Sequence, residues 1–436
     1  MSVNNRQRRA MKARKARKQR RPHPGPTPPP TDPFSQSDEF QLGAASLALR
    51  QLVLRRASRL RLMTDAEAEF ARCTDRHQQL AFDDQLAHLV SGLFAHGWAP
   101  LDLYEAARRN VDAAVTEQLM CVVAQQTAGR GAVHAEWAAQ VSALSKVVDG
   151  GSCAWARRTG LPWATAREQL VDLLVLLVSM PVLETVLSAP GTPAAARNAA
   201  PAQVDERVLR KVRALLAKAE STEYDDEAEA LTAKAQQLMT SHSIERAMAE
   251  GSQQARSHPA VRRIWLDAPY LTAKSMVIHA VARSNDCYSI LSKTWGFVTL
   301  VGHIADLDTT ELLSTSLLVQ ATRAMTATGS HTTRYGTSRT RLFRQSFLVA
   351  YAGRIGERLC EASEAAQTTA DAEHGGTLLP VLAARADETR AAAEAMFSEV
   401  TRTKVSAGDR AGWGAGRAAA DLARFDVRAA LHERAG

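Results

Sequence analysis

Two polar residues after a predicted strand are the nearest approach to a catalytic or metal-binding pair in this sequence. His303 and Asp306 follow the apolar run at 297–301, where an imidazole and a carboxylate could exchange protons or bind a metal ion. Two residues do not complete a site, and none of the twelve histidines forms an H-E-x-x-H pattern. We therefore predict no metal site and interpret the pair as a polar turn in which Asp306 or Asp308 caps the next helix.

The other signatures of catalysis are equally weak. There is no G-x-S-x-G motif, and Cys287 follows Asp286, whose negative charge raises the pKa of a neighbouring thiol. The glycine-rich stretch 412–417 could offer backbone N–H groups to an anion, but it lacks the lysine and the spacing of a P-loop. We predict a flexible connection there, leading to a helix that starts near Ala418, and no cofactor.

A basic cluster in a Ser/Thr/Gly-rich loop is the strongest candidate for a binding site. Its members, beside His331 and Phe343, are Arg334, Tyr335, Arg339, Arg341 and Arg344. Arginines with an interleaved aromatic residue can hold phosphates and stack on bases, which makes these five the nucleic-acid-binding candidates. Alternatively, Arg341 and Arg344 pair with acids such as Asp306 or Glu311. The sequence leaves both interpretations open.

Most of the net charge lies in the first 41 residues. Residues 1–41 hold ten Lys/Arg and three acids, or +7 of the total of +8, which leaves 44 basic and 43 acidic residues for the remainder. Seven prolines follow the basic run, and such a segment cannot bury apolar surface. We predict a disordered tail that either contacts phosphates in a salt-sensitive way or only keeps the protein in solution.

The elements that must position these residues are mostly helical, and we predict a mainly α fold. A chain of 436 residues is too long for one core, so two or three domains are expected. Residues 42–188 show apolar residues at helical spacing and predict an all-helical domain, followed by a Pro/Ala-rich linker at 189–203. Gly97, Pro100 and Asp102 predict a helix end and a new helix start, with Trp98 filling a gap between helices.

The most apolar run, 171–180, is too short for a membrane span, which needs about 20 residues.

Residues 204–248 form the clearest local unit. Two amphipathic segments at 205–219 and 226–241 have facing Ala/Leu stripes and a polar turn between them, which predicts a central antiparallel helical hairpin. Residues 206–245, with Leu215-Leu216-Ala217-x-Ala219-Glu220 and Leu238-Met239, resemble the uncharacterised domain-of-unknown-function family catalogued under number 2786. The stretches 97–103 and 416–422 resemble the flanks of larger proteins of this kind. The resemblance implies no activity and no catalytic residues.

The last part of the chain has a different character. Alternating patterns predict strands at 261–266, 287–291 and 297–301, and helices at 272–283, about 306–325, 342–370 and 382–401. This order predicts a small α+β domain at 258–402 with a mostly antiparallel sheet. Residues 403–436 would then be a glycine-bearing tail with a short helix.

These features are compatible with three classes of function. The five cysteines are widely spaced and form no C-x-x-C pair, which favours a reducing cytoplasm over a disulfide-bonded or zinc-binding protein. We expect a non-enzymatic, nucleic-acid-associated protein that uses the tail and the loop at 331–344, with no membrane contact. The alternatives are a hydrolase or nuclease-like enzyme with a site near His303, Asp306 and Arg341, and an adaptor whose hairpin docks a protein partner.

Overall fold

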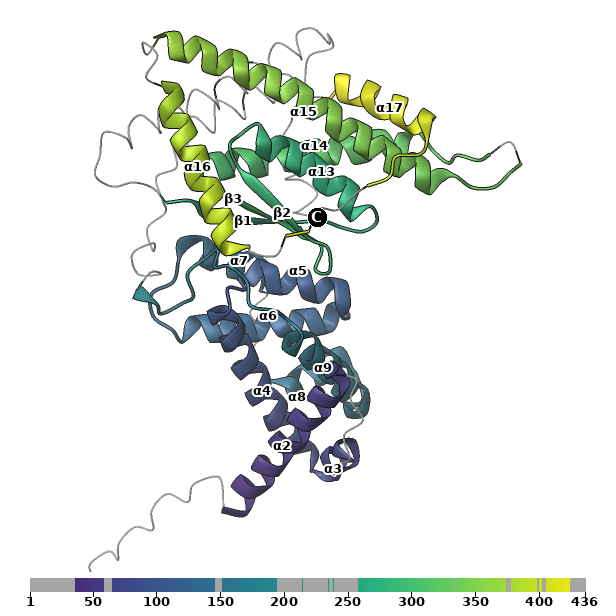
Figure 1. Ribbon diagram of the computed structural model, residues 1–436. Coiled ribbons are helices and arrows are strands. Elements are labelled where there is room, and N and C mark those ends of the chain that lie inside the picture. The colour runs from purple at the N-terminus through teal and green to yellow at the C-terminus, as the bar shows by residue number, and fades with distance from the viewer. Residues whose placement is uncertain are drawn as a thin grey trace, which may run out of the picture.

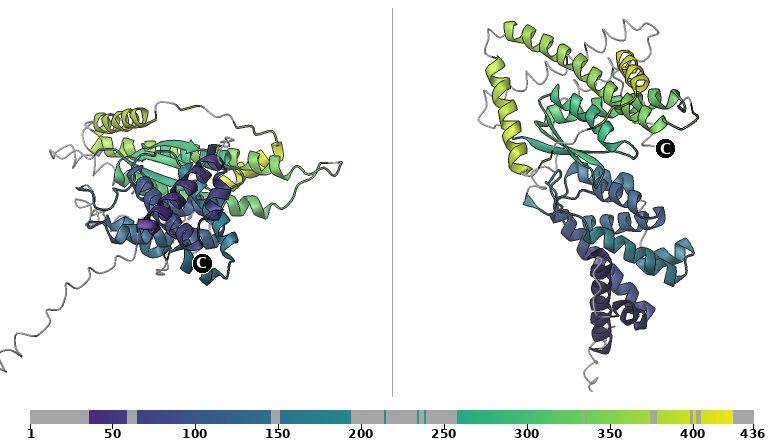
Figure 2. Two further views of the ribbon diagram at one scale, coloured as in Figure 1. Left: turned by 90° about the horizontal axis from the view of Figure 1, so that it is seen from below. Right: turned by 45° about the vertical axis from the view of Figure 1, so that its right-hand side comes forward.

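The described residues form two domains that are stacked end to end (Figures 1 and 2). The computed structural model describes residues 36–58, 65–145, 151–193, 258–333, 335–373, 378–397, 400–401 and 405–423, with Ala214, Lys234 and Leu238 as single positions. A helical domain at 36–193 lies below an α+β domain at 258–423 in Figure 1. The predicted mainly α fold, with an all-helical N-terminal part and a small α+β C-terminal part, is confirmed. The predicted hairpin lies outside the described residues except for the three single positions.

The helical domain consists of short helices around one aromatic and aliphatic core. Edge-to-face ring pairs such as Phe94–Trp137, with centroids 4.8 Å apart, fill the space between them. None of the described helices is long and apolar enough to cross a bilayer. The helices are α2 (Gln36–Ser58), α3 (Ala66–Arg72), α4 (Asp75–Ala95), α5 (Pro100–Asn110), α6 (Ala113–Ala128), α7 (Ala135–Leu144), α8 (Ser152–Thr159) and α9 (Trp163–Val178).

Helix α2 corrects the predicted end of the tail. It begins at Gln36, so the boundary at residue 41 falls inside a helix. Asp38 and Glu39 lie in its first turn, where carboxylates interact favourably with the free N–H groups of a helix start. The apolar stripe begins at Leu42 and therefore predicts a helix start that is several residues too late, because a helix's first turn need not contain a residue of the stripe.

The sheet of the α+β domain is antiparallel, as predicted, and is covered on both faces. Its strand order is β1-β3-β2, with β1 (Ala260–Trp265), β2 (Tyr288–Ser292) and β3 (Phe297–Gly302). Every residue of the central strand β3 is buried. One face packs on α13 (Leu271–Arg283) and α14 (Ile304–Ala327) through side chains such as Leu300 and Ile278. The other face meets the helical domain and α16 (Leu378–Met396).

The longest described helix, α15 (Thr340–Glu373), packs along α17 (Arg410–Asp421) (Figure 1). Gly412 and Gly416 of α17 approach α15 so closely that a Cβ atom at either position would collide with the carbonyl oxygen of Phe343 or Phe347. The four-residue spacing places both glycines on one helix face. The prediction of a flexible glycine connection was therefore wrong, because these glycines lie inside the helix and provide its contact surface.

A buried ion pair joins the two domains. Arg263 of β1 donates to the Asp102 carboxylate of α5 at 2.5 Å and to the Gly97 carbonyl at 3.0 Å, and both charged side chains are at most 5% exposed. Asp102 also accepts from the Trp265 indole at 2.9 Å and from the Ala99 amide at 3.1 Å. Among the described residues, the donors to this carboxylate come from β1 of the other domain and from the residue that precedes α5.

Tryptophans surround this ion pair. Trp98 is fully buried, donates to the Pro181 carbonyl at 2.8 Å and packs edge-to-face on Trp295 of the other domain at 5.4 Å. The predicted helix start at Pro100 and the predicted gap-filling role of Trp98 are therefore confirmed. The gap that Trp98 fills also lies between the domains, which local sequence does not reveal.

Substitutions in α17 test the close helix contact. Gly416→Ala should lower the free energy of unfolding by about 1–3 kcal/mol, because the added methyl group overlaps a backbone oxygen. Gly414→Ala is the matched control: it lies on the same helix with no atom within 4 Å of the added Cβ. This control should raise stability by up to about 1 kcal/mol. Equal effects in urea denaturation would contradict the packing described.

A second pair of substitutions tests the domain contact. Asp102→Ala should cost about 3–5 kcal/mol, because the Arg263 guanidinium is then buried without its counter-charge. Asp387→Ala removes the same kind of ion pair, Asp387–Arg390, from an exposed surface and should cost at most about 1 kcal/mol. Chemical denaturation followed by tryptophan fluorescence measures both, and a small loss for Asp102→Ala would show that the pair does not hold the domains.

Candidate functional site

The loop that carries the predicted basic cluster projects from the α+β domain. It joins α14 to α15 and extends to the right in Figure 1 as a narrow turn closed by a bridge between Thr332 and Ser338. Its base is fixed, since the His331 ring stacks on Phe343 with centroids 3.5 Å apart and the His331 carbonyl accepts from the Arg339 amide at 2.9 Å. Tyr335 near the tip is 78% exposed. Arg334 lies outside the described residues.

Arg339 is held at the base of this loop by an acid. Its guanidinium lies 3.5 Å from the carboxylate of Asp409, which is buried and also accepts from the Gly412 amide at 2.8 Å as the N-cap of α17. Arg339 therefore stabilises the start of α17 by balancing a buried negative charge. Its side chain is still 38% exposed, so part of the guanidinium faces solvent.

Arg341 and Lys293 face a hollow of about 830 Å³ beside the first turn of α15. Both cations are exposed, and Gln345 and Ser406 line the same hollow. A neighbouring hollow of about 550 Å³ is lined by Arg339 and Arg410 on the other side of this turn. Among the described residues that line the two hollows, Asp409 alone carries a negative charge. The result is a positively charged surface at the base of the projecting loop.

Ion pairing with Asp306 or Glu311 does not account for this cluster, so that alternative was wrong. Asp306 pairs with Arg385 at 3.1 Å and Glu311 with Arg262 at 2.7 Å. Arg341 has no ion pair among the residues that the structure describes. Arg344 is half-buried, and its Nε atom has no hydrogen-bond partner there.

Sequence reasoning missed Lys293 and Arg410 as parts of this surface. Lys293 is a single lysine in the turn between β2 and β3, and Arg410 precedes the glycines of α17. Lys293 has no basic residue within nine positions, and the basic residues closest to Arg410 in sequence, Lys404 and Arg417, are six and seven positions away. The local signal for either residue is therefore weak. Only the packing of α17 and of the β2–β3 turn around the start of α15 brings them to the loop.

The catalytic candidates His303 and Asp306 are both buried, at 4% and 6% exposure. The prediction that Asp306 caps the helix was wrong, because α14 begins at Ile304 with His303 in the N-cap position. Asp306 instead holds Arg385, and so ties α16 to the start of α14. Arg341, which was grouped with this pair, lines a hollow that neither residue reaches.

The nearby Cys287 is unsuited to nucleophilic chemistry. Burial raises the pKa of its thiol, and the negative charge of Asp306 raises it further. The charge of Asp286, which the sequence singled out, contributes less than either. Within the described ranges, no three His, Cys, Asp or Glu residues come together in a way that could hold a metal ion.

The segment between the two domains is similar to a known sequence family. Residues 207–246 match the family model described as Protein of unknown function (DUF2786). The predicted resemblance over 206–245 is thereby confirmed. In the DUF2786 segment the structure describes only three positions, of which Leu238 is half-buried and packs against the core shared by α13, α14 and α15. No curated protein and no solved structure matches the chain.

Two arginines of the loop should differ in their structural role. Arg339→Ala should lower stability by about 1 kcal/mol, because Asp409 loses its cation. Arg341→Ala removes an exposed side chain with no ion pair among the described residues and should change stability by at most about 0.5 kcal/mol. Thermal melts of both variants check this. A larger loss for Arg341→Ala would mean that it supports the fold.

Proposed function

We propose that this protein binds nucleic acid through the base of the 331–344 loop. The observation that carries the proposal is the pair of neighbouring hollows, which place Lys293, Arg339, Arg341 and Arg410 around one helix start with one buried acid. Such a surface attracts a phosphate backbone without selecting its sequence. The exposed Tyr335 supplies a ring on which a base can stack.

The tail adds a second source of affinity in this proposal. Residues 1–41 contain ten Lys/Arg and three acids, so we expect them to contribute non-specific, salt-dependent binding. The loop then supplies contacts in a fixed geometry. The five cysteines are free, which supports a cytoplasmic location as part of the same proposal.

Binding of a labelled single strand and of the matching duplex, measured by anisotropy between about 50 and 200 mM salt, tests this function. The full chain and a chain lacking residues 1–35 are compared, so that α2 stays intact. In the shortened chain, the double variant Lys293→Ala/Arg341→Ala should weaken binding. The slope of log affinity against log salt concentration should become shallower by about one for each phosphate that is no longer bound. Arg72→Ala, which removes an exposed arginine of the helical domain, is the control and should change neither.

Tyr335→Ala separates base stacking from charge. It should weaken binding of the single strand roughly tenfold and leave the salt slope unchanged. If the shortened chain binds neither nucleic acid, or if the loop variants bind as tightly as Arg72→Ala, the loop does not perform this function. The enzyme alternative would instead require reaction at His303 and Asp306, which are shielded from solvent.

A further inference from the structure

A cleft of about 860 Å³ opens between the two domains. Small-molecule sites have volumes of about 300–1,000 Å³, so the cleft is of the size that holds a small organic ligand. One wall is a single face of α14, where Thr315, Leu318, Val319 and Thr322 follow at spacings of three and four residues. The other walls come from α5, the end of β1 and the start of α13.

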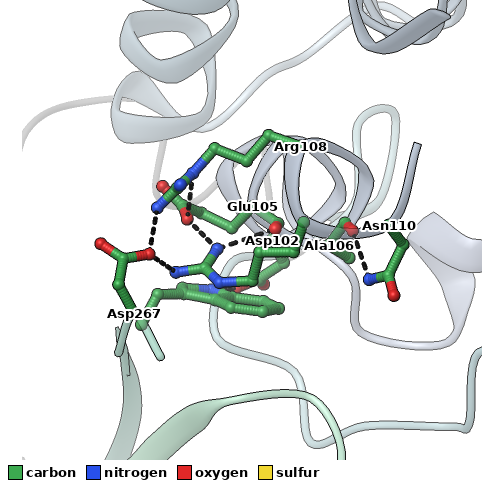
Figure 3. A network of polar contacts seen from close by, with 8 residues as sticks. Asp102, Glu105, Ala106, Arg108, Asn110 and Asp267 are labelled. Atoms are coloured by element: carbon green, nitrogen blue, oxygen red, sulfur yellow. Dashed lines mark hydrogen bonds and ion pairs between the residues drawn. The ribbon is translucent and has the colours of Figure 1, made fainter. Parts of the chain in front are cut away.

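The acids that line this cleft already have cations. Arg108 of α5 lies 2.8 Å from both Glu105 and Asp267, and Arg109 lies 2.9 Å from Asp267 (Figure 3). Glu105 also pairs with Arg109. Two carboxylates are thus matched by two guanidinium groups that join α5 to the segment after β1. This network contributes no net charge to the cleft.

Lys274 is a cation of this cleft that forms no close ion pair with a described residue, and the Asp267 carboxylate acts on it from a longer distance. Among the described residues, its ammonium lies within ion-pair distance of no carboxylate, and it donates one hydrogen bond, to the Asp267 carbonyl at 2.6 Å. An ammonium has three N–H donors, so two are left for a ligand. Arg323 lines the cleft as well. Burial lowers the pKa of Lys274, because the ammonium has lost part of its hydration.

The threonines define what else a ligand must carry. The Thr315 hydroxyl donates to the Glu311 carbonyl at 2.8 Å, and the Thr322 hydroxyl donates to the Leu318 carbonyl at 2.7 Å. Each hydroxyl hydrogen is therefore used within the helix, while each oxygen can still accept. Leu318 and Val319 between them offer apolar surface. A ligand that fits these groups has an anionic end, an apolar or planar body, and hydroxyl or amino donors.

We propose that the interdomain cleft binds a small organic anion of this kind, with its phosphate or carboxylate on Lys274 and its donors on Thr315 and Thr322. The site goes beyond nucleic-acid binding at the loop and does not depend on it. Its ligand contacts both domains, since α5 supplies one wall and α13 and α14 supply the others.

Titration calorimetry of the full chain with AMP, adenosine, inorganic phosphate and benzoate tests the proposal. AMP combines an anionic group, a planar body and hydroxyl and amino donors. Adenosine lacks the anionic group, inorganic phosphate lacks the planar body, and benzoate lacks the donors. AMP should bind at least about tenfold tighter than any of them, and Lys274→Met should weaken AMP roughly tenfold or more. Lys274→Arg should retain most of the affinity. Lys234→Met, which removes an exposed lysine, is the control and should bind AMP like the unchanged chain.

Thr322→Trp supplies an independent test, because the indole obstructs the cleft at the α14 wall and leaves Lys274 in place. It should abolish AMP binding and leave nucleic-acid binding by the loop unchanged. The proposal is overturned if neither AMP nor benzoate binds at about 10 mM, or if AMP binds equally well to Lys274→Met and Thr322→Trp. AMP binding that survives in Lys274→Met but disappears in Arg341→Ala would place the nucleotide on the loop and would also overturn it.

Discussion

The arrangement of the two domains depends on the Asp102 carboxylate and the Arg263 guanidinium, which lie 2.5 Å apart and are almost inaccessible to water. A buried charge is costly unless its partners are complete. Here the partners come from the turn after α4, from α5 and from β1, so all three must be in place together. The interdomain cleft and the orientation of the sheet follow from this contact.

The α+β domain is organised around α15. Its first turn carries the loop with the basic cluster, and its next turns pack on the glycine face of α17. The Asp409 side chain joins these features, because it caps α17 and pairs with Arg339 at the loop base. The surface proposed to meet phosphates is therefore fixed by the same contact that positions the last described helix.

Sequence patterns predicted the elements well and their partners poorly. The helix start at Pro100 and the three strands are encoded in neighbouring residues, through capping and through alternation of apolar side chains. Asp102 and Arg263 are separated by 161 residues, and nothing near either one specifies the other. Lys293 and Arg410 were missed as site residues for the same reason. The N-cap of α14 was misplaced because an aspartate is the more common cap, whereas β3 ends at Gly302 and leaves His303 at the junction.

The glycine contact between α17 and α15 limits how this protein can change over generations. The atoms that a side chain at Gly412 or Gly416 would strike are the main-chain oxygens of Phe343 and Phe347. A second-site suppressor works by shrinking the neighbour that obstructs a new side chain, but no substitution removes a peptide oxygen. Replacing either phenylalanine with a smaller residue would leave the obstruction in place and weaken the core as well. We therefore expect that no second substitution in α15 restores stability once Gly412 or Gly416 has been replaced. Gly414, which lies on the open face of α17, accepts other residues.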